Sequence, residues 1–179
     1  MLTATVYNFD IDLADQDRGV YETLALRVAR HPSESEAYLW TRVIAYALEF
    51  GDGIEFSRGG ISEPDDPPIA IRDLTGAYRC WIEIGAPDAD RLHKAAKASP
   101  RVVVYLHKDP AQWLARLGGA RIHRADAIEV RALDRALLAS LTTRLERRVA
   151  FSLSVNESEL YVSIGSDTLV GGVTRIRIQ

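Results

Sequence analysis

The sequence predicts an α/β (α+β) fold in which a mixed sheet is flanked by helices and joined by an accessory, mostly antiparallel β-sheet. Three observations predict this class. Residues 3–13 and 21–30 alternate apolar and polar side chains with the period of a strand, around a turn-forming segment at 14–19. Apolar residues between 40 and 50 recur at helical spacing. The run Val-Val-Val-Tyr-Leu at 102–106 is typical of a strand covered on both faces.

The first half of the chain is predicted to alternate strands and helices. After the hairpin, a helix at 33–50 begins near Pro32, whose fixed φ suits a first helical turn. A short strand at 54–57 and a loop at 58–68 follow, and two strands then lie within 69–84. A helix at 88–98 and a buried strand at 101–106 complete this part of the chain.

The second half is predicted to supply the accessory elements. Asp109 caps a helix at 110–117, and a strand at 121–131 and a helix at 133–146 follow. Three strands, at 148–155, 159–165 and 168–178, end the chain and are predicted to join the N-terminal strands in the accessory sheet. We therefore expect a single domain over 1–179, with its core at about 23–106 and accessory elements at 1–22 and 107–179.

Composition excludes several kinds of site. The formal net charge of −3 gives no overall electrostatic case for nucleic-acid binding, although a local basic patch is compatible with it. A single cysteine, Cys80, excludes an internal disulfide and a multi-cysteine zinc site. The N-terminal residues do not resemble a signal peptide, and no segment approaches the roughly 20 apolar residues of a membrane helix. These features predict a cytoplasmic protein without a membrane partner.

Several segments carry a resemblance to known families. The chain resembles the YaeQ family along nearly all its length, in Arg30-His31-Pro32-Ser33-Glu34, in Phe56-Ser57-Arg58-Gly59, and in Trp81 to Asp88 with Arg91 and Lys94. Asp73, followed by Glu83-Ile84-Gly85, is also similar to the Asp…Glu-x-Lys arrangement of the PD-(D/E)XK nuclease superfamily, with Gly85 in place of the lysine. This resemblance implies a restriction-endonuclease-like core, whose element order matches that predicted for 23–106.

The resemblance implies a set of catalytic residues. Phosphodiester hydrolysis commonly uses a divalent cation held by carboxylates, and Asp73 and Glu83 are the predicted ligands of Mg²⁺ or Mn²⁺. Lys94, on the following helix, is the candidate for the displaced motif lysine. Glu34 falls on the superfamily's first-helix glutamate. The predicted catalytic set is therefore Glu34, Asp73, Glu83 and Lys94.

The geometry of the turn between the two central strands leaves two alternatives. A tight hairpin at Thr75-Gly76 would place Glu83 opposite Pro68, and Asp66 or Asp65 would then replace Asp73 as the first acid. Similarly, Lys97 is the alternative to Lys94.

Two functions follow from this sequence. The first is a metal-dependent phosphodiesterase or nuclease. The alternative is a non-catalytic module that retains the nuclease fold and binds nucleic acid or protein. The glycine at the lysine position and the negative net charge weaken the first, whereas the retained acids and the Arg91 and Lys94 pair favour it.

Overall fold

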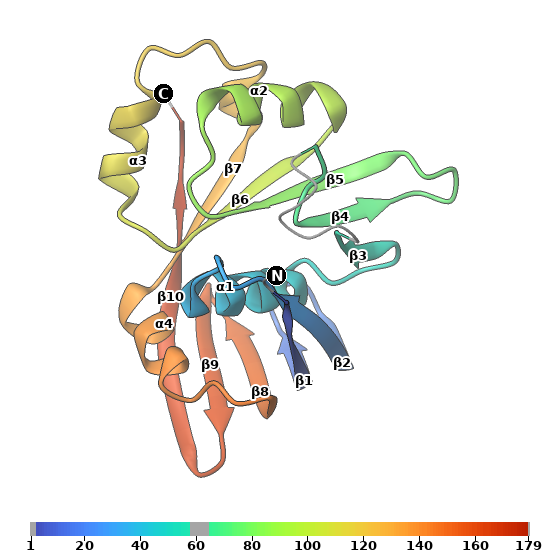
Figure 1. Cartoon of the computed structure of the whole chain (residues 1–179), viewed down its shortest axis with the longest axis vertical. Coiled ribbons are helices and arrows are strands. Elements are labelled where there is room, and N and C mark those ends of the chain that lie inside the picture. The colour runs from blue at the N-terminus through green and yellow to red at the C-terminus, as the bar shows by residue number, and fades with distance from the viewer. Residues whose placement is uncertain (1–2, 58–64, 179) are drawn as a thin grey trace. The chain divides into compact units, whose positions relative to one another are not determined.

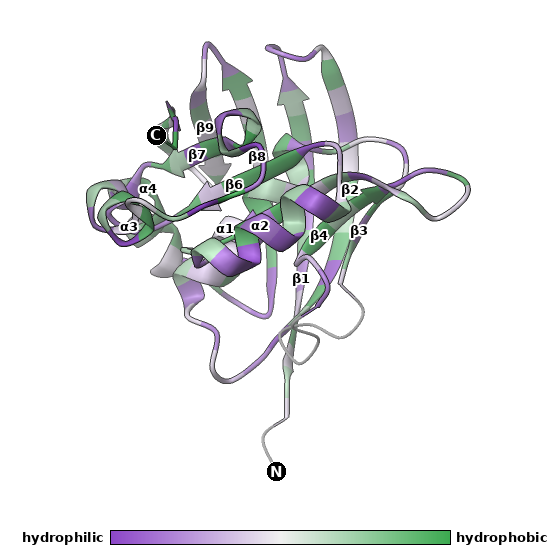
Figure 2. Ribbon diagram, turned by 90° about the horizontal axis from the view of Figure 1, so that it is seen from above, coloured by the Kyte–Doolittle hydropathy of each residue, from purple (hydrophilic) through white to green (hydrophobic). Residues whose placement is uncertain are grey.

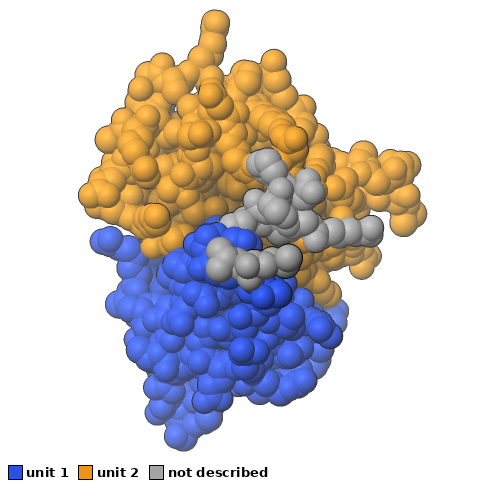
Figure 3. Space-filling view, in the orientation of Figure 1, with its two compact units in different colours: residues 1–40, 133–174 blue, residues 41–132, 175–179 orange. Residues whose placement is uncertain are grey.

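A computed structural model describes residues 3–57 and 65–178 and shows a mixed α/β fold (Figure 1). Most of the predicted loop at 58–68, including the Arg58-Gly59 pair of the family segment, lies outside the described residues. The chain divides into two compact units (Figure 3). Unit 1 comprises residues 1–40 and 133–174, and unit 2 comprises residues 41–132 and 175–179. No described helix is long and apolar enough to cross a membrane.

Unit 1 is built on strands from both ends of the sequence, in the order β2-β1-β8-β9-β10. Neighbouring strands pair antiparallel except β1 and β8, which are parallel. The terminal strands therefore pair mostly antiparallel, as the sequence predicts. The strands are β1 (Thr5–Asp15), β2 (Val20–Arg30), β8 (Arg148–Asn156), β9 (Glu159–Ile164) and β10 (Asp167–Ile176).

The core of unit 1 is formed by the apolar positions of this sheet. Trp40 is fully buried, with its ring centroid 5.3 Å from that of Phe9 and 5.5 Å from that of Phe151. Helix α4 (Arg135–Thr142) buries its leucines and is capped by Asp134, whose Oδ1 accepts a hydrogen bond from the Leu137 amide. The alternation of β1 and β8 therefore buries one face of each strand.

Unit 2 contains the mixed sheet that the sequence predicts, with strand order β7-β6-β5-β4-β3. Strands β3, β4 and β5 pair antiparallel, whereas β5, β6 and β7 are parallel. Glu83 pairs in register with Val104, so the strand at 101–106 lies beside the strand of Glu83, as predicted. The strands are β3 (Ile54–Phe56), β4 (Ile69–Arg72), β5 (Tyr78–Ile84), β6 (Val102–Leu106) and β7 (Glu129–Leu133).

Two amphipathic helices cover one face of this sheet. They are α2 (Ala89–Ala98) and α3 (Pro110–Leu117), and hydrophilic and hydrophobic residues alternate along α2 in Figure 2. Leu92 and Trp113 are buried in the same core as Trp81 and Val104. The Trp113 indole also donates a 2.8 Å hydrogen bond to the Pro87 carbonyl, which fixes the segment that leads from β5 into α2.

Three predicted boundaries are wrong. Helix α1 (Glu36–Leu48) begins three residues later than predicted because Ser35, whose Oγ accepts from the Tyr38 amide, provides the N-terminal cap. The strand predicted at 121–131 begins only at Glu129. Arg124 has a left-handed φ of 48° and a 3₁₀ turn covers 125–127, so an extended strand cannot form there. Helix α4 ends at Thr142 rather than near 146.

Candidate functional site

Glu83 is a buried carboxylate on the α2 side of the unit 2 sheet. Its side chain is 5% exposed, and its Oε2 accepts hydrogen bonds from the Trp81 indole at 2.9 Å and from Arg91 Nε at 2.8 Å. Burial raises the pKa of Glu83, while Arg91 and the Trp81 hydrogen bond oppose that rise. Glu83 is therefore held in an ion pair with hydrogen bonds from two directions.

Arg91, rather than Lys94, supplies the cation next to Glu83. Its guanidinium lies 5.7 Å from the Trp81 ring and also donates to the Asp66 carbonyl at 2.8 Å. Asp88 caps α2 by accepting from the Arg91 amide, which sets the first turn of the helix against the end of β5. Lys94, one turn further on, pairs with the exposed Asp65 carboxylate.

Asp73 lies in the turn between β4 and β5. Its Oδ1 accepts from the Thr75 amide, the Thr75 hydroxyl and the Ala77 amide, and the Thr75 hydroxyl is the main cause of the lowered pKa of Asp73. The β4–β5 ladder pairs Ile69 with Ile82 and so sets Glu83 opposite Pro68. The length of β5 therefore separates Asp73 from Glu83, as the tight-hairpin alternative implies.

Asp65 and Asp66 lie closer to the α2 end of the site than Asp73 does. Lys94 pairs with the side chain of Asp65, and Arg91 binds the main-chain carbonyl of Asp66. Within the described residues the structure thus brings Glu83, Arg91, Lys94 and the 65–66 segment together. Glu34 belongs to unit 1, where it is buried and its Oε1 accepts from the His31 amide at 3.4 Å.

The donors around Glu83 do not form the set that Mg²⁺ prefers. That ion takes carboxylates, carbonyls and several waters, whereas Glu83 Oε2 already accepts from an indole and a guanidinium. No group of three or more His, Cys, Asp or Glu side chains that could hold a metal occurs in the ranges 3–57 and 65–178. Gly85, at the position of the motif lysine, has a φ of 96°, where a lysine would be strained.

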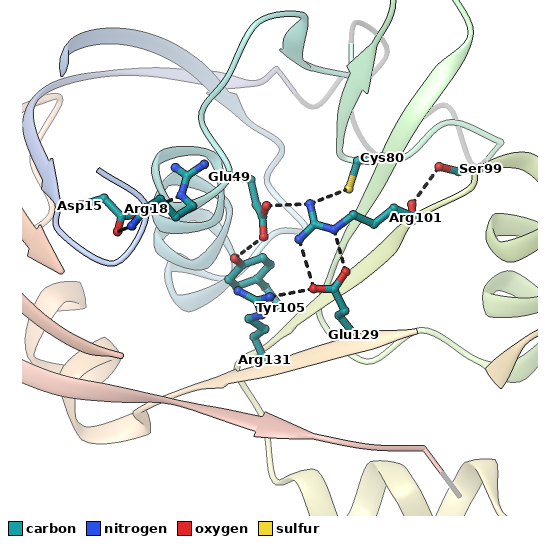
Figure 4. Close-up of polar contacts among 9 residues, drawn as sticks. All are labelled: Asp15, Arg18, Glu49, Cys80, Ser99, Arg101, Tyr105, Glu129 and Arg131. Carbon is teal, nitrogen blue, oxygen red and sulfur yellow. Dashed lines mark hydrogen bonds and ion pairs between the residues drawn. The ribbon is translucent and has the colours of Figure 1, made fainter. Parts of the chain in front are cut away.

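A second polar cluster, which the sequence analysis did not identify, lies within unit 2 and is drawn in Figure 4. Arg101 bridges two acids: it donates to Glu49 Oε2 at 3.1 Å and to both oxygens of Glu129 at 2.6 and 3.2 Å. The buried Tyr105 hydroxyl donates to Glu49 at 2.8 Å, and Arg131 donates to Glu129 at 2.8 Å. We call these five residues the Arg101 cluster.

The electrostatics of the Arg101 cluster are those of a structural network. Burial opposes the charge on Arg101, but its hydrogen bonds to Glu129 and Glu49, with the negative charge of Glu49, outweigh burial and raise the pKa of the guanidinium. Burial also raises the pKa of Tyr105, and the neighbouring Glu49 raises it further. The nearby Cys80 thiol has a pKa raised to about 12 by burial, which makes it a poor nucleophile. The two glutamates and two arginines balance in charge.

A charge pattern in the sequence marks a third feature, which the overall net charge hides. Residues 91–125 contain one acid, Asp109, whose side chain caps α3. The same stretch contains eight lysines and arginines: Arg91, Lys94, Lys97, Arg101, Lys108, Arg116, Arg121 and Arg124. Counting charges within this window, rather than over the whole chain, would have found it.

Comparisons with known proteins agree on one family. The family model described as YaeQ protein matches residues 1–171. "Uncharacterized protein YaeQ" of Salmonella typhi is 27% identical, over 94% of this chain and 93% of its own, and the protein of that name in Escherichia coli (strain K12) is 26% identical, over 97% and 96%. The crystal structure of YaeQ protein from Pseudomonas syringae has a TM-score of 0.87 at 27% identity, covering 97% of this chain and 96% of that one. The structure from Xanthomonas axonopodis pv. citri has a TM-score of 0.88 at 30% identity, over 99% and 100%.

Proposed function

This chain belongs to the YaeQ family, and from that premise we propose that it is a non-catalytic nucleic-acid-binding module with a nuclease-like fold. The basic stretch 91–125 carries the proposal, because Lys and Arg that contact phosphates supply most of the affinity for nucleic acid. The chain order α1-β3-β4-β5-α2-β6 supports the nuclease-like part, since it resembles the order of the PD-(D/E)XK core.

Three basic side chains of this stretch, Lys97, Arg121 and Arg124, belong to segments that meet at the C-terminal end of α2. The His123 amide donates to His93 Nδ1 at 2.9 Å, which places the segment after α3 against α2. Arg124 donates to the Ala96 and Ser99 carbonyls at 3.2 Å each, and these bonds also hold the segment after α3 against the end of α2. Lys97 lies between these carbonyls in the sequence and is exposed, as is Arg121. We call the surface formed by His93, Lys97, Arg121, His123 and Arg124 the α2 basic surface.

The division of charge between the units agrees with this location. Unit 2 contains 15 lysines and arginines against 13 aspartates and glutamates, whereas unit 1 contains 7 against 12. The net charge of −3 therefore comes from unit 1, and it does not argue against a polyanion bound to unit 2.

Glu83 supports the non-catalytic part of the proposal. A metal ligand must offer its oxygens to the ion, but Glu83 is paired with Arg91, and a cation beside a divalent metal would oppose binding. Arg91 and Trp81 instead give the carboxylate a structural role at the junction of β5 and α2.

The test is a binding titration of fluorescent single- and double-stranded DNA and RNA, repeated over a range of salt concentrations. The double variant Lys97→Ala, Arg121→Ala is compared with the protein itself. These side chains have exposed positions and no hydrogen bond or ion pair with another described residue. We expect weaker binding, and a slope of log K against log salt that is shallower by about 1.4, since each phosphate contact contributes about 0.7 on single strands.

The matched control is Arg27→Ala, Arg135→Ala, which removes two exposed arginines of unit 1. We expect this control to bind nucleic acid like the original protein, with the same salt slope. Equal weakening by both double variants would show only a response to net charge, and would contradict an interface on the α2 basic surface. The absence of any binding at low salt would refute the proposed function itself.

A further inference from the structure

A cavity of about 370 Å³ in unit 2 lies beside the segment that carries Asp66. Its wall includes the apolar Phe56, Pro67 and Ala70, and its polar groups come from Glu55, Ser57, Asp66 and Arg72. This volume exceeds that of a nucleobase. The cavity shares no side chain with Glu83 or with the Arg101 cluster.

Two polar groups of the cavity have no partner among the described residues. The Asp66 carboxylate accepts no hydrogen bond and forms no ion pair there; only its main-chain carbonyl is bound, by Arg91. The Ser57 hydroxyl also lacks a hydrogen-bond partner, but protein covers it, so it cannot contact a ligand in the cavity. The half-buried Asp66 carboxylate is therefore the group that a ligand of the cavity can satisfy.

The cation of the cavity is already bound to three partners, and its charge is paired with that of Glu55. Arg72 donates to Glu55 at 2.8 Å, to the Gly76 carbonyl at 3.0 Å and to the Tyr78 hydroxyl at 3.2 Å, with its guanidinium 4.3 Å from the Tyr78 ring. Because Glu55 balances the charge of Arg72, the unpaired charge of the cavity is the Asp66 carboxylate. This carboxylate favours a ligand that offers hydrogen-bond donors over a phosphate.

We propose that this cavity binds an unstacked guanine base. Guanine presents an acceptor followed by two neighbouring N–H donors along one edge. Those two donors match the two oxygens of the Asp66 carboxylate. The other bases do not present two adjacent donors. A cationic arginine side chain offers similar donors, but it would meet Arg72 and the neighbouring Arg91.

This inference rests on the proposed function and names the base that the bound strand would contribute. Asp66 is joined through its carbonyl to Arg91, and its neighbour Asp65 pairs with Lys94. The cavity thus adjoins the helix that carries Lys97. A strand whose phosphates lie along α2 is positioned to turn one base into the cavity.

The experiment uses neutral nucleosides, which carry no phosphate and so test the cavity apart from the α2 basic surface. Guanosine, inosine, adenosine, cytidine and uridine are titrated against the full chain and followed by calorimetry. We expect guanosine to bind at least about tenfold more tightly than the other four, since inosine lacks the second donor. Asp66→Asn should remove that preference. Asp52→Asn, an exposed acid of the same unit, should leave it unchanged.

Each outcome separates this inference from the proposed function. Equal binding of all five nucleosides, or a guanosine preference that survives Asp66→Asn, would overturn the guanine site. Preferential, Asp66-dependent binding of N-acetyl-arginine amide would overturn it in favour of a peptide side chain. Oligonucleotide binding that depends on Lys97 and Arg121, without guanosine binding, would leave the proposed function standing and refute only the cavity.

Discussion

Among single residues, Glu83 has the most informative surroundings, because two donors converge on one of its oxygens. We expect Glu83→Ala to lower the free energy of unfolding by about 2–3 kcal/mol, since the Trp81 indole and the Arg91 guanidinium would both lose their acceptor. Urea titration followed by tryptophan fluorescence measures this change.

Glu83→Gln is the matched control for that substitution. The amide keeps an acceptor oxygen at the same place, so we expect it to retain more than half of the stability that Glu83→Ala loses. A Glu83→Ala protein more stable than the original would contradict the structural role. That result is instead typical of a carboxylate kept under strain for metal binding.

Glu129 should make stability depend on pH. Burial raises the pKa of its carboxyl, but the hydrogen bonds and positive charges of Arg101 and Arg131 together outweigh burial and lower the pKa. The folded pKa lies below the unfolded one, so the contribution is complete above the unfolded pKa and is lost as the pH falls through the folded value. We expect Glu129→Gln to destabilise the protein at pH 7 and to differ little from it near pH 3, as measured by urea titration. A constant difference at both values would contradict this linkage.

Cys80 should be unreactive in the folded protein. Its thiol is buried and has a pKa raised to about 12, so little thiolate exists at pH 8. We expect iodoacetamide to label it in urea but not under native conditions over the same time, as read by mass spectrometry. Rapid native labelling would show that the strand around Cys80 opens readily.

At the scale of elements, the sequence predicted strands and helices best where periodicity and end signals agreed. The apolar run of β6 and the Asp88 and Asp109 caps located their elements to within a residue. The strand predicted at 121–131 failed for a physical reason. Ile122 and Ile128 are both buried and imitate alternation, but the left-handed Arg124 between them turns the chain.

The packing of β10 on α4 provides a sharp test at this scale. A Cβ on Gly171 would lie 2.7 Å from Leu137 Cβ and 2.8 Å from Asp134 Cβ, whereas a Cβ on Gly172 would meet nothing closer than 3.8 Å. We expect Gly171→Ala to cost about 1–3 kcal/mol through overpacking. Gly172→Ala should be nearly neutral by the same thermal or urea measurement. Equal effects would mean that α4 moves aside without cost.

The candidate site was less predictable than the elements. Arg91 and Lys94 lie one turn apart on α2, and sequence alone cannot decide which of them reaches Glu83. The side-chain conformation and the Asp88 cap settle that choice for Arg91. The Arg101 cluster was missed because its members are joined across the sheet: Glu49 and Arg101 are 52 residues apart, and Arg101 and Glu129 are 28 apart.

For the whole molecule, the decisive measurement is whether metal and hydrolysis accompany nucleic-acid binding. We expect calorimetric titration with Mn²⁺ to give no binding that depends on Glu83 or Asp73. The Glu83 carboxylate is paired with Arg91, and the Asp73 carboxylate accepts hydrogen bonds within its own turn. Labelled DNA and RNA should remain intact with Mg²⁺ or Mn²⁺ at low salt. Hydrolysis that is lost in Glu83→Ala would restore the metal-dependent phosphodiesterase.

Each unit is assembled from two segments that lie far apart in the sequence, and this has a consequence for biosynthesis. Unit 1 combines the β1–β2 hairpin with strands that begin at residue 148, and the core of unit 2 includes Ile178. More than a hundred residues separate the β1–β2 hairpin from β8, its neighbour in the sheet. During translation the hairpin therefore leaves the ribosome long before β8 has been synthesised. Neither unit can complete its core until nearly all of this sequence has emerged, so the nascent chain must remain unaggregated through most of its own translation.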